Sequence, residues 1–589
     1  MSRRVSGIHA ALALALTAPL TLAAPLALTG RAAATDQYTV TAVKFTVRAG
    51  GRDCAVDADL YRPAGVDRAH PAPAVLATNG FGGSKSDGST DAIGRTFARR
   101  GYVGLVYSGL GFGRSGCPIS LDDPDIDGTA ASGLVDFLAG TRAADDGTRA
   151  DFVTLDTKGD PRVGMIGGSY GGAVQLATAA VDHRVDALVP MVTWHDLAYS
   201  LDPDNGGSVP GVFKWQWTNG FYLMGETQPL TVPGLDPTRI NSLACVHFVS
   251  EACALIRALN SGSYPAKATA DVLGYARSVS PVSYLKRVEA PTLLVQGQAD
   301  SLFNLNEATA TYKTLRAQGT TAKMIWQSWG HSGGSVAGEL DLGRGDLESS
   351  YVGRRIAAWC ERYLRGRTSV DTGPAFAYYR DWITDPAGTY ATAGRLPALE
   401  KKLYLSGDGR LVDDRAEVAR GSRDYVNRPV PTSHSENSPS GMTGLPDPAP
   451  YDTRGTFLGW TGAPLIRTTD VVGAPRATLK VVSPAARRVQ NSGDAADRLV
   501  LFAKLYDLAP DGTGTLVHRL VAPVRIPDVT KTFTVTLPGI VHRFTKGHRL
   551  RFVIAASDDA YTGNRGIKPV TVISSPRDTG VLELPVVGG

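Results

Sequence analysis

The stretch "GMIGGSYGG", from Gly164 to Gly172, places a single serine, Ser169, between two pairs of glycines. It follows the short segment "GDPRV" and leads into the apolar, alanine-rich run "GGAVQLATAAV" at 171–181. Gly-Ser-Gly stretches also form ordinary turns, so the flanking segments decide the interpretation. A buried strand before G-x-S-x-G and a helix after it are typical of a tight turn that exposes a nucleophilic serine. The pattern therefore predicts Ser169 as a nucleophile.

The surrounding sequence alternates short apolar runs with helix-length segments from about Tyr38 to Arg395. Two N-terminal runs alternate apolar and polar residues, which predicts an antiparallel hairpin at a sheet edge. Continuous apolar runs are typical of buried parallel strands and occur at 73–79, 102–108, 162–168, 185–192, 291–297 and 323–329. Helices are predicted between them at 91–101, 131–142, 171–181, 306–319 and 349–366. The fold class is therefore α/β, with a mostly parallel sheet.

Two other regions depart from this alternation. At about 195–286 the sequence is aromatic and irregular, which indicates a helical cap inserted above the carboxyl edge of the sheet. From 396 to 589, strand-like runs separated by Gly, Pro and Asp turns predict an all-β jelly-roll of the galactose-binding-like kind. The Pro- and Ser-rich segment 427–452 is predicted to be a long surface loop. The expected organisation is a signal at 1–34, a catalytic domain at 35–395 and a β-sandwich domain at 396–589.

The N-terminus is typical of a cleaved secretory signal. Arg3 and Arg4 precede an Ala- and Leu-rich run, and Ala32–Ala34 offers a cleavage site before Thr35. Pro19 and Pro25 interrupt the run and disfavour a membrane anchor, while the arginine pair leaves Sec and twin-arginine export as alternatives. Cleavage lowers the formal charge from +5 to +2, because three arginines and no acid are removed. A nearly neutral chain without basic runs disfavours nucleic acid as a partner, and no later segment is predicted to span a membrane.

Five cysteines enter an oxidising compartment if the chain is exported. Cys245 and Cys253 are close enough in sequence to close a small loop, and Cys54–Cys117 is a second candidate pair. The sequence does not fix the connectivity, and the odd count leaves one thiol over. The spacing of these cysteines is not that of a zinc site. Acyl transfer by a serine nucleophile needs neither a metal nor an organic cofactor, so we expect none.

A serine nucleophile needs a base and an acid that orients the base. In the strand–turn–helix context their order along the chain is Ser, acid, His. Nine of the ten histidines fall in the signal, beside the sheet's body, in the cap or in the β-rich region, which leaves His331 in the loop after 323–329. Asp300 follows the strand predicted at 291–297. A helix cap for Asp300 and a solvated loop for His331 are the alternatives, but their order and strand-end positions favour a triad.

The tetrahedral oxyanion of acyl transfer needs two hydrogen-bond donors. The N–H of Tyr170, directly after the nucleophile, is predicted as one donor. The second is expected from "GFGGSKSD" at 80–87, from the N–H of Phe81. The Gly-rich stretches 80–87 and 109–116 lack a complete phosphate cradle and a following helix, respectively, so nucleotide binding is not expected.

The stretches "RVGMIGGSYGG", "YSGLGFGRSG", "QGQADSLF", "WGH" and "AAWCERYLRG" resemble the X-prolyl dipeptidyl peptidase and cocaine esterase group of α/β-hydrolases (peptidase family S15). The C-terminal stretches "KKLYLSGDGRL" and "AKLYDLAPDGTG" resemble that family's β-sandwich domain. By this resemblance Ser169, Asp300 and His331 are nucleophile, acid and base.

Two features depart from the family or stay open. Relatives place a tyrosine side chain in the oxyanion hole, whereas Phe81 has no hydroxyl, which favours a backbone donor here. Peptidase relatives anchor the free amino terminus of the substrate with acidic and aromatic groups. The cap offers acids and tryptophans that fit this role or a solvated loop equally well: Asp196, Asp202, Asp204, Glu226, Trp215 and Trp217.

Three functions follow from the sequence. The first is a secreted serine hydrolase of the X-Pro dipeptidyl peptidase type, acting on short peptides through an acyl-enzyme. The second is a carboxylesterase or amidase that acts on small acyl substrates. The third is a cell-wall or glycan binder with a vestigial hydrolase half, which the intact Ser, Asp and His set disfavours. The oligomeric state is not predicted.

Overall fold

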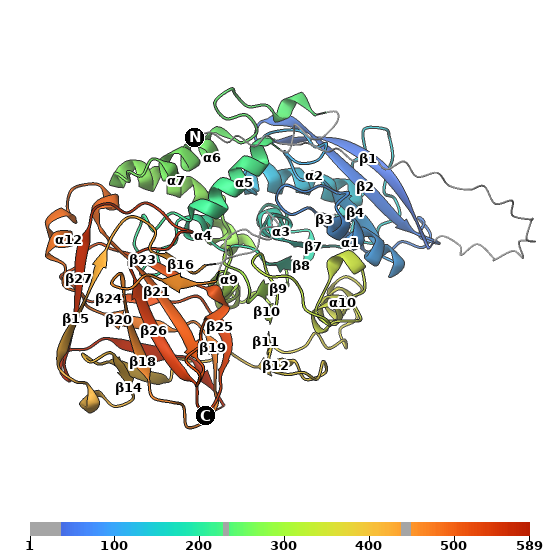
Figure 1. The fold of residues 1–589 in the computed structure, drawn as a ribbon. Helices are drawn as coiled ribbons and strands as arrows, with labels where there is room; N and C mark the ends of the chain where they lie inside the picture. Colours follow the sequence, from blue (N-terminus) through green and yellow to red (C-terminus); the bar gives the residue numbers. More distant parts are fainter. Residues whose placement is uncertain (1–36, 228–234, 437–448, 589) are drawn as a thin grey trace, which may run out of the picture. The chain divides into compact units, whose positions relative to one another are not determined.

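The computed structural model describes residues 37–227, 235–436 and 449–588. Its first sheet has ten strands and is built from residues 38–393 (Figure 1). The central strands β4 to β11 run parallel, while β1, β2 and β12 pair antiparallel at the edges. In spatial order the strands are β1 (Tyr38–Ala49), β2 (Arg52–Pro63), β4 (Val103–Tyr107), β3 (Ala74–Thr78), β7 (Val163–Gly168), β8 (Val185–Met191), β9 (Thr292–Gly297), β10 (Ala322–Gln327), β11 (Phe376–Tyr379) and β12 (Tyr390–Ala393). The mostly parallel sheet predicted from the sequence is confirmed.

Helices cover both faces of this sheet, because its central strands are apolar on both sides. In β3, Leu76 packs into one hydrophobic cluster and its neighbours Val75 and Ala77 into the other. The first cluster includes α2 (Thr129–Leu138), α3 (Tyr170–Val181) and α9 (Leu305–Ala317). The second includes α1 (Gly88–Arg99) and α10 (Tyr351–Tyr363). Burial on both faces explains the continuous apolar runs in the sequence.

Among its described residues, the segment between β8 and β9 contains five α-helices joined by irregular stretches. Its helices are α4 (Leu197–Leu201), α5 (Trp215–Thr227), α6 (Ser250–Asn260), α7 (Ala266–Ser278) and α8 (Pro281–Tyr284). The apolar side chains of α4, α5, α6 and α7 form a cluster with Tyr170 of α3 and with Leu302 and Phe303 beyond β9, whereas Tyr284 of α8 packs into the first cluster of the sheet. The cap helices therefore pack over the carboxyl ends of β7 and β9.

The C-terminal region is β-rich, as predicted. Its largest sheet follows the order β22 (Gly514–Leu516), β21 (Leu499–Leu508), β26 (Arg549–Ala555), β18 (Phe457–Gly462), β14 (Arg410–Val412), β13 (Lys401–Leu405), β28 (Val581–Leu584), β20 (Arg476–Leu479) and β24 (Phe533–Thr536), and β23 (Ala522–Ile526) also pairs with β21. Smaller sheets pair β15 (Gly421–Asn427) with β27 (Lys568–Ser574), β16 (Ser433–His434) with β17 (Tyr451–Asp452), and β19 (Thr469–Gly473) with β25 (Ile540–Phe544) and β29 (Val586–Val587). One short helix, α12 (Pro484–Val489), lies among the described strands.

One prediction for this region is wrong. The Pro- and Ser-rich segment 427–452 was expected at the surface, yet Ser433–Glu436 is almost completely buried. The ammonium of Lys504 on β21 is also buried, and it donates to the hydroxyls of Ser433 and Ser435. A buried lysine needs such partners, so this part of the segment belongs to the interior.

The predicted signal at 1–34 lies outside the described residues, and the domain boundary at 395/396 stays a prediction. The first sheet ends at Ala393 and the second begins at Lys401, while Gln37–Gly589 packs as one unit. In the described part of the chain, no helix is both long and apolar enough to span a bilayer.

Candidate active site

Ser169 occupies the sharp turn between β7 and α3. Its backbone has φ 55° and ψ −121°, a conformation that side-chain-bearing residues rarely adopt. Its N–H donates to the carbonyl oxygen of Met191 at 2.9 Å, which fixes the turn against the end of β8. The strained turn lifts the hydroxyl above the carboxyl edge of the sheet, as expected for a nucleophile elbow.

The glycines around Ser169 are required by close backbone contacts. A Cβ added at Gly167 would lie 2.6 Å from the carbonyl oxygen of Gly171. A Cβ added at Gly171 would lie 2.5 Å from the carbonyl oxygen of Thr78. Both distances are too short for any side chain, so the G-x-S-x-G spacing follows from the geometry of the turn.

Asp300 and His331 follow the neighbouring parallel strands β9 and β10, and the structure brings both to Ser169. The Nε2 atom of His331 lies 2.9 Å from Ser169 Oγ, and its Nδ1 atom lies 2.7 Å from Asp300 Oδ2. An ionised carboxylate only accepts hydrogen bonds, so Nδ1 carries the proton and Nε2 faces the serine as an acceptor. In this geometry the imidazole can act as a base toward the serine, and the carboxylate can orient the imidazole.

The carboxylate of Asp300 is completely buried and held on both oxygens. Its Oδ1 accepts from the N–H groups of Leu302 at 3.1 Å and Phe303 at 2.8 Å. Its Oδ2 accepts from the backbone N–H of His331 at 3.3 Å as well as from the imidazole. These bonds hold the carboxylate behind the imidazole with little freedom to rotate.

The two predicted oxyanion donors lie beside the serine. Tyr170 is the first residue of α3, and a Cβ added at Gly80 would lie 3.9 Å from Ser169 Cβ, which places the loop after β3 against the turn. Within the described residues, neither the N–H of Tyr170 nor that of Phe81 donates to another group. Their role as donors to a negatively charged oxygen at Ser169 stays a prediction.

An apolar cavity opens at Ser169 beneath the cap helices. It encloses about 70 Å³. Its walls are Phe81, Leu121, Tyr170, Trp194, Leu197, Leu201, Thr218, Phe221, Tyr222, Phe248, Ala252, Leu255, Ile256, Leu302 and Phe303. None of these side chains carries a charge, so the cavity suits an uncharged, apolar group. The ring of Phe81 packs against those of Phe112, Tyr170, Phe221 and Phe248, so it forms part of the wall.

A second, more polar cavity of about 350 Å³ also reaches Ser169. It is lined by Ser89 and Thr90 at the start of α1, by Trp329, and by Asp341. The serine thus stands between an apolar cavity and a cavity that offers hydroxyls and a carboxylate.

The four acidic residues considered as amine anchors do not line the apolar cavity. Asp196 caps α4 through the N–H of Ala198 and pairs with Arg277 at 3.0 Å. Glu226 lies 3.8 Å from the imidazole of His247. Both carboxylates are therefore engaged away from the cavity.

Asp202 and Asp204 are buried at the contact between the cap and the β-rich region. Asp202 accepts from the N–H of Gly211 at 2.8 Å, and Asp204 from that of Arg525 at 2.7 Å. Burial raises the pKa of both carboxyls to about 6. They stabilise this contact and do not face the serine's apolar cavity.

The two tryptophans have different positions. Trp217 lies edge-on to the imidazole of His331, with ring centroids 6.2 Å apart. Trp215 is 39% exposed, and its indole donates to the carbonyl oxygen of Asp559 in the β-rich region. Only Trp217 adjoins the triad.

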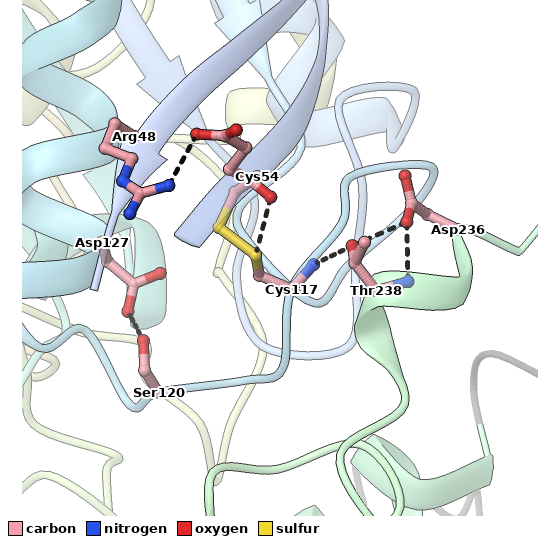
Figure 2. Close-up of a disulfide and its surroundings, with 8 residues drawn as sticks. Arg48, Cys54, Cys117, Ser120, Asp127, Asp236 and Thr238 are labelled. Atoms are coloured by element: carbon pink, nitrogen blue, oxygen red, sulfur yellow. Dashed lines mark hydrogen bonds and ion pairs between the residues drawn. A yellow bond between two sulfur atoms is a disulfide. The ribbon is translucent and has the colours of Figure 1, made fainter. Parts of the chain in front are cut away.

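Sequence reasoning missed the wall of the cavity that Leu121 provides. Figure 2 shows the loop that carries it: Cys117 is bonded to Cys54 of β2, and its N–H donates to Thr238 at 3.0 Å. Farther along the loop, the hydroxyl of Ser120 donates to Asp127 (Figure 2). The candidate Cys54–Cys117 pair was the sequence signal that this loop is fixed.

The second candidate pair is also bonded. Cys253 of α6 joins Cys245, on either side of Phe248, which lines the cavity. The carboxylate of Glu226 lies close to both sulfurs, but sulfurs in a disulfide are not the thiolates that bind metal ions. Both disulfides therefore brace walls of the apolar cavity, and Cys360 is a buried thiol.

Two family models match the chain. Residues 51–333 match the X-Pro dipeptidyl-peptidase (S15 family), and residues 379–567 match the X-Pro dipeptidyl-peptidase C-terminal non-catalytic domain. The chain belongs to the S15 family. The resemblance read from the sequence is thereby confirmed, and the family places the chain among the serine hydrolases of ester or amide bonds.

Solved structures share the whole architecture. An α-amino acid ester hydrolase superposes with a TM-score of 0.63 at 17% identity, over 95% of this chain and 98% of that one. An aminopeptidase from a marine sediment archaeon, Thaumarchaeota archaeon, gives a TM-score of 0.60 at 14% identity over 95% of this chain and 98% of that one. A CocE/NonD family hydrolase from Staphylococcus aureus gives 0.60 at 14% identity over 93% and 96%. The TM-scores and the coverage show a common fold, and at these identities they show the fold alone. No curated protein sequence matches the chain.

Proposed function

We propose that this protein hydrolyses ester or amide bonds through an acyl-enzyme formed on Ser169. Ser169 Oγ attacks the substrate's carbonyl carbon while His331 Nε2 takes the hydroxyl proton. The imidazolium, held by Asp300, then gives that proton to the leaving oxygen or nitrogen as its bond to carbon breaks. Water then attacks the carbonyl carbon of the acyl-enzyme by the same steps, which releases the acid and frees Ser169. The continuous contact from Ser169 through His331 to Asp300 is the observation that carries the proposal.

The apolar cavity supports a short, uncharged acyl group as the substrate's acid half. A dry cavity of about 150 Å³ holds a benzene molecule, and this one encloses about half that volume. An acyl chain of about two to four carbons fits such a space. A charged α-ammonium group would enter the cavity without a carboxylate partner, which costs free energy. We therefore favour the esterase or amidase alternative over the dipeptidyl peptidase.

The X-Pro dipeptidyl-peptidase function remains the second candidate, because the family model that matches residues 51–333 carries that description. The pyrrolidine ring of a proline is itself a small apolar group suited to the cavity. This candidate requires a carboxylate near the substrate's amino terminus. The contacts of Asp196, Asp202, Asp204 and Glu226 do not support that role, so the carboxylate that it leaves is Asp341, which lines the second cavity at Ser169.

A substrate panel tests the proposal. p-Nitrophenyl esters from acetyl to octanoyl are compared with Ala-Pro and Gly-Pro p-nitroanilides, using wild type and Ser169→Ala. We expect the largest kcat/KM for the two- to four-carbon esters and a loss on the order of 10⁶-fold in kcat for Ser169→Ala. Preferential cleavage of the prolyl anilides would favour the peptidase. Hydrolysis that survives Ser169→Ala, or fluorophosphonate labelling that survives it, would overturn the proposed function. A folded protein that binds glycans without any hydrolysis would favour the third function, a cell-wall or glycan binder.

We also infer that the chain is exported with its N-terminal segment removed. The disulfides Cys54–Cys117 and Cys245–Cys253 support this, because disulfides persist mainly outside the reducing cytosol. Mass spectrometry of the protein from culture medium is expected to give a mature chain that starts at Thr35. Recovery of the intact N-terminus from the cell interior would contradict export.

A further inference from the structure

Two serines tie together the loops that carry the acid and the base. Ser301 follows Asp300, and Ser332 follows His331. The N–H of Ser301 donates to Ser332 Oγ at 2.9 Å, and the two hydroxyl oxygens lie 2.7 Å apart. The N–H of Ser332 in turn donates to the carbonyl oxygen of Ala299 at 3.0 Å. The separation between the two loops is thus set beside the Asp300–His331 contact.

The cap holds the acid loop at this same point. The ammonium of Lys214, directly before α5, donates to the carbonyl oxygen of Ser301. Trp217, in the first turn of α5, donates from its indole N–H to Ser301 Oγ at 3.1 Å and packs edge-on to His331. The amino end of one cap helix therefore contacts both loops.

The β-rich region reaches Lys214 from the other side. The Oε1 atom of Glu436 lies 3.1 Å from Lys214 Nζ, and only 4% of the lysine side chain and 2% of the glutamate side chain are exposed. Tyr561 donates its hydroxyl to the other carboxylate oxygen, and its ring centroid lies 5.6 Å from the ammonium. The ammonium that holds the acid loop thus faces a carboxyl more than 100 positions away in the sequence. Burial raises the pKa of Glu436 to about 7, against the lowering effect of Lys214.

A buried ion pair of this kind is not explained by stability alone. Removing two charges from water costs several kcal/mol, and apolar residues of similar volume often stabilise a protein as well or better. A pair whose lysine also donates to the residue next to Asp300 has a second role available, which is to set the position of that loop. None of Lys214, Ser301, Ser332 and Glu436 lines the apolar cavity.

We propose that Glu436, Lys214, Ser301 and Ser332 form a relay through which the β-rich region positions Asp300 and His331 for proton transfer. The four are positioning residues, and the inference rests on the proposed function. Because they act on the triad and do not line the acyl cavity, weakening the relay lowers kcat and leaves KM for a short ester nearly unchanged. A misplacement of about 1 Å in an active site costs up to about 100-fold in rate.

The first test uses small changes in the two serines. Ser301→Ala and Ser332→Ala are expected to lower kcat for p-nitrophenyl acetate about 10- to 100-fold, with KM within about twofold. Ser301→Thr keeps the hydroxyl and is expected to recover most of the rate. Asp494→Asn is the matched control, because Asp494 also joins the cap to the β-rich region, through Ser263 and Tyr264, without touching either loop. Unchanged kcat in the alanine variants, or an equal loss in the control, overturns the relay.

The second test asks whether Glu436, in the β-rich region, is coupled energetically to Ser301, beside the acid. Glu436→Gln is combined with Ser301→Ala in a double-mutant cycle, with thermal unfolding recorded for each variant. The relay requires coupling, so the double variant is expected to lose little more rate than the worse single variant. Losses that multiply overturn it. The paired change Lys214→Met with Glu436→Gln removes both charges together and is expected to lower kcat even when the protein folds normally.

These outcomes separate the relay from the proposed function. Hydrolysis that depends on Ser169 but not on the relay residues overturns the relay alone. Hydrolysis that persists in Ser169→Ala overturns the proposed function and the relay with it.

Discussion

At the scale of single residues, Ser169 combines a chemical role with an unfavourable backbone. Its φ of 55° and ψ of −121° are typical of glycine, and such strain costs on the order of 1–3 kcal/mol. The neighbouring glycines relieve contacts that a Cβ would make, but the serine itself keeps the strain. A residue held this way indicates that the hydroxyl's position was kept at the expense of stability.

This strain predicts a difference in stability between two variants of Ser169. Ser169→Gly is expected to have a free energy of unfolding roughly 1 kcal/mol higher than that of Ser169→Ala, and so a higher melting temperature. The reason is that glycine adopts this conformation without a Cβ penalty. Both variants are expected to be inactive. Thermal unfolding of the two purified variants measures the difference directly, and an alanine variant at least as stable as the glycine variant would contradict the strain.

The sequence predicted the three contacting side chains but not the residues around them. Ser169, Asp300 and His331 follow from a local motif and from strand ends, which leave a readable pattern. Leu121 and Glu436 act through tertiary contacts and lie in loops whose patterns indicate only turns. For the acids of the cap, the sequence left an amine site and a solvated loop as equal alternatives, and their hydrogen bonds and ion pairs engage them elsewhere.

At the scale of elements, the two disulfides close loops of very different length. Cys54 and Cys117 are 63 residues apart, whereas Cys245 and Cys253 are 8 apart. A cross-link stabilises mainly by reducing the entropy of the unfolded chain, and the effect grows with the logarithm of the loop length. Leu121, which lines the cavity, lies four residues beyond Cys117 and so just outside the loop that this disulfide closes.

Removing the two cross-links separately is therefore expected to have unequal effects. Cys54→Ala with Cys117→Ala is expected to cost about 2–4 kcal/mol, and Cys245→Ala with Cys253→Ala about 1.8 kcal/mol less than that. Denaturant unfolding of both double variants measures the difference. Equal losses would show that native-state contacts, and not loop entropy, set the contribution.

Glu307 on α9 joins this helix to the start of the cap. Its carboxyl oxygens accept from the N–H of His195 at 2.6 Å, the N–H of Asp196 at 3.1 Å and the hydroxyl of Ser200 at 2.5 Å. Burial raises its pKa from 4.5 to about 7, against the lowering effect of these bonds. The folded state therefore binds this proton more tightly than the unfolded state does.

The sign of the resulting pH dependence follows from linkage. The contribution of Glu307 to stability is complete below pH 4.5 and is lost as the pH rises through about 7. Glu307→Gln removes this titration, so its melting temperature is expected to fall less than that of wild type between pH 5 and pH 8. Parallel curves for the two proteins in thermal unfolding would show that Glu307 titrates normally.

The elements themselves were largely predictable where hydrophobic periodicity is strong. Six buried strands of the first sheet, β3, β4, β7, β8, β9 and β10, appear where continuous apolar runs predicted them, whereas the short buried strand β11 was not predicted. In the apolar-rich run 516–526, His518 and Arg519 adopt positive φ, so the strand begins only at Ala522. Periodicity does not report such backbone conformations.

At the scale of the whole molecule, buried charges join the cap to the β-rich region. Arg525 of β23 is completely buried and donates to the carbonyl oxygens of Gly211, Ala495 and Gly563 at 2.6–2.8 Å. Its charge lowers the pKa of Asp202 and Asp204 against the raising effect of burial. Sequence composition cannot reveal this contact, because its partners lie far apart in the sequence, in the cap and in the β-rich region, and no local pattern in either region indicates the other.

Arg525→Met tests whether the two regions unfold together. The variant leaves two buried carboxyls without their cation, which is expected to cost about 3–5 kcal/mol at pH 8. At pH 5 both carboxyls are largely protonated, since their pKa is about 6, so the loss is expected to be smaller. Arg543→Met is the control, because it breaks a partly exposed pair with Asp470. Because Gln37–Gly589 packs as one unit, calorimetry is expected to show one transition that moves as a whole, whereas a second transition or an equal loss at both pH values would contradict this coupling.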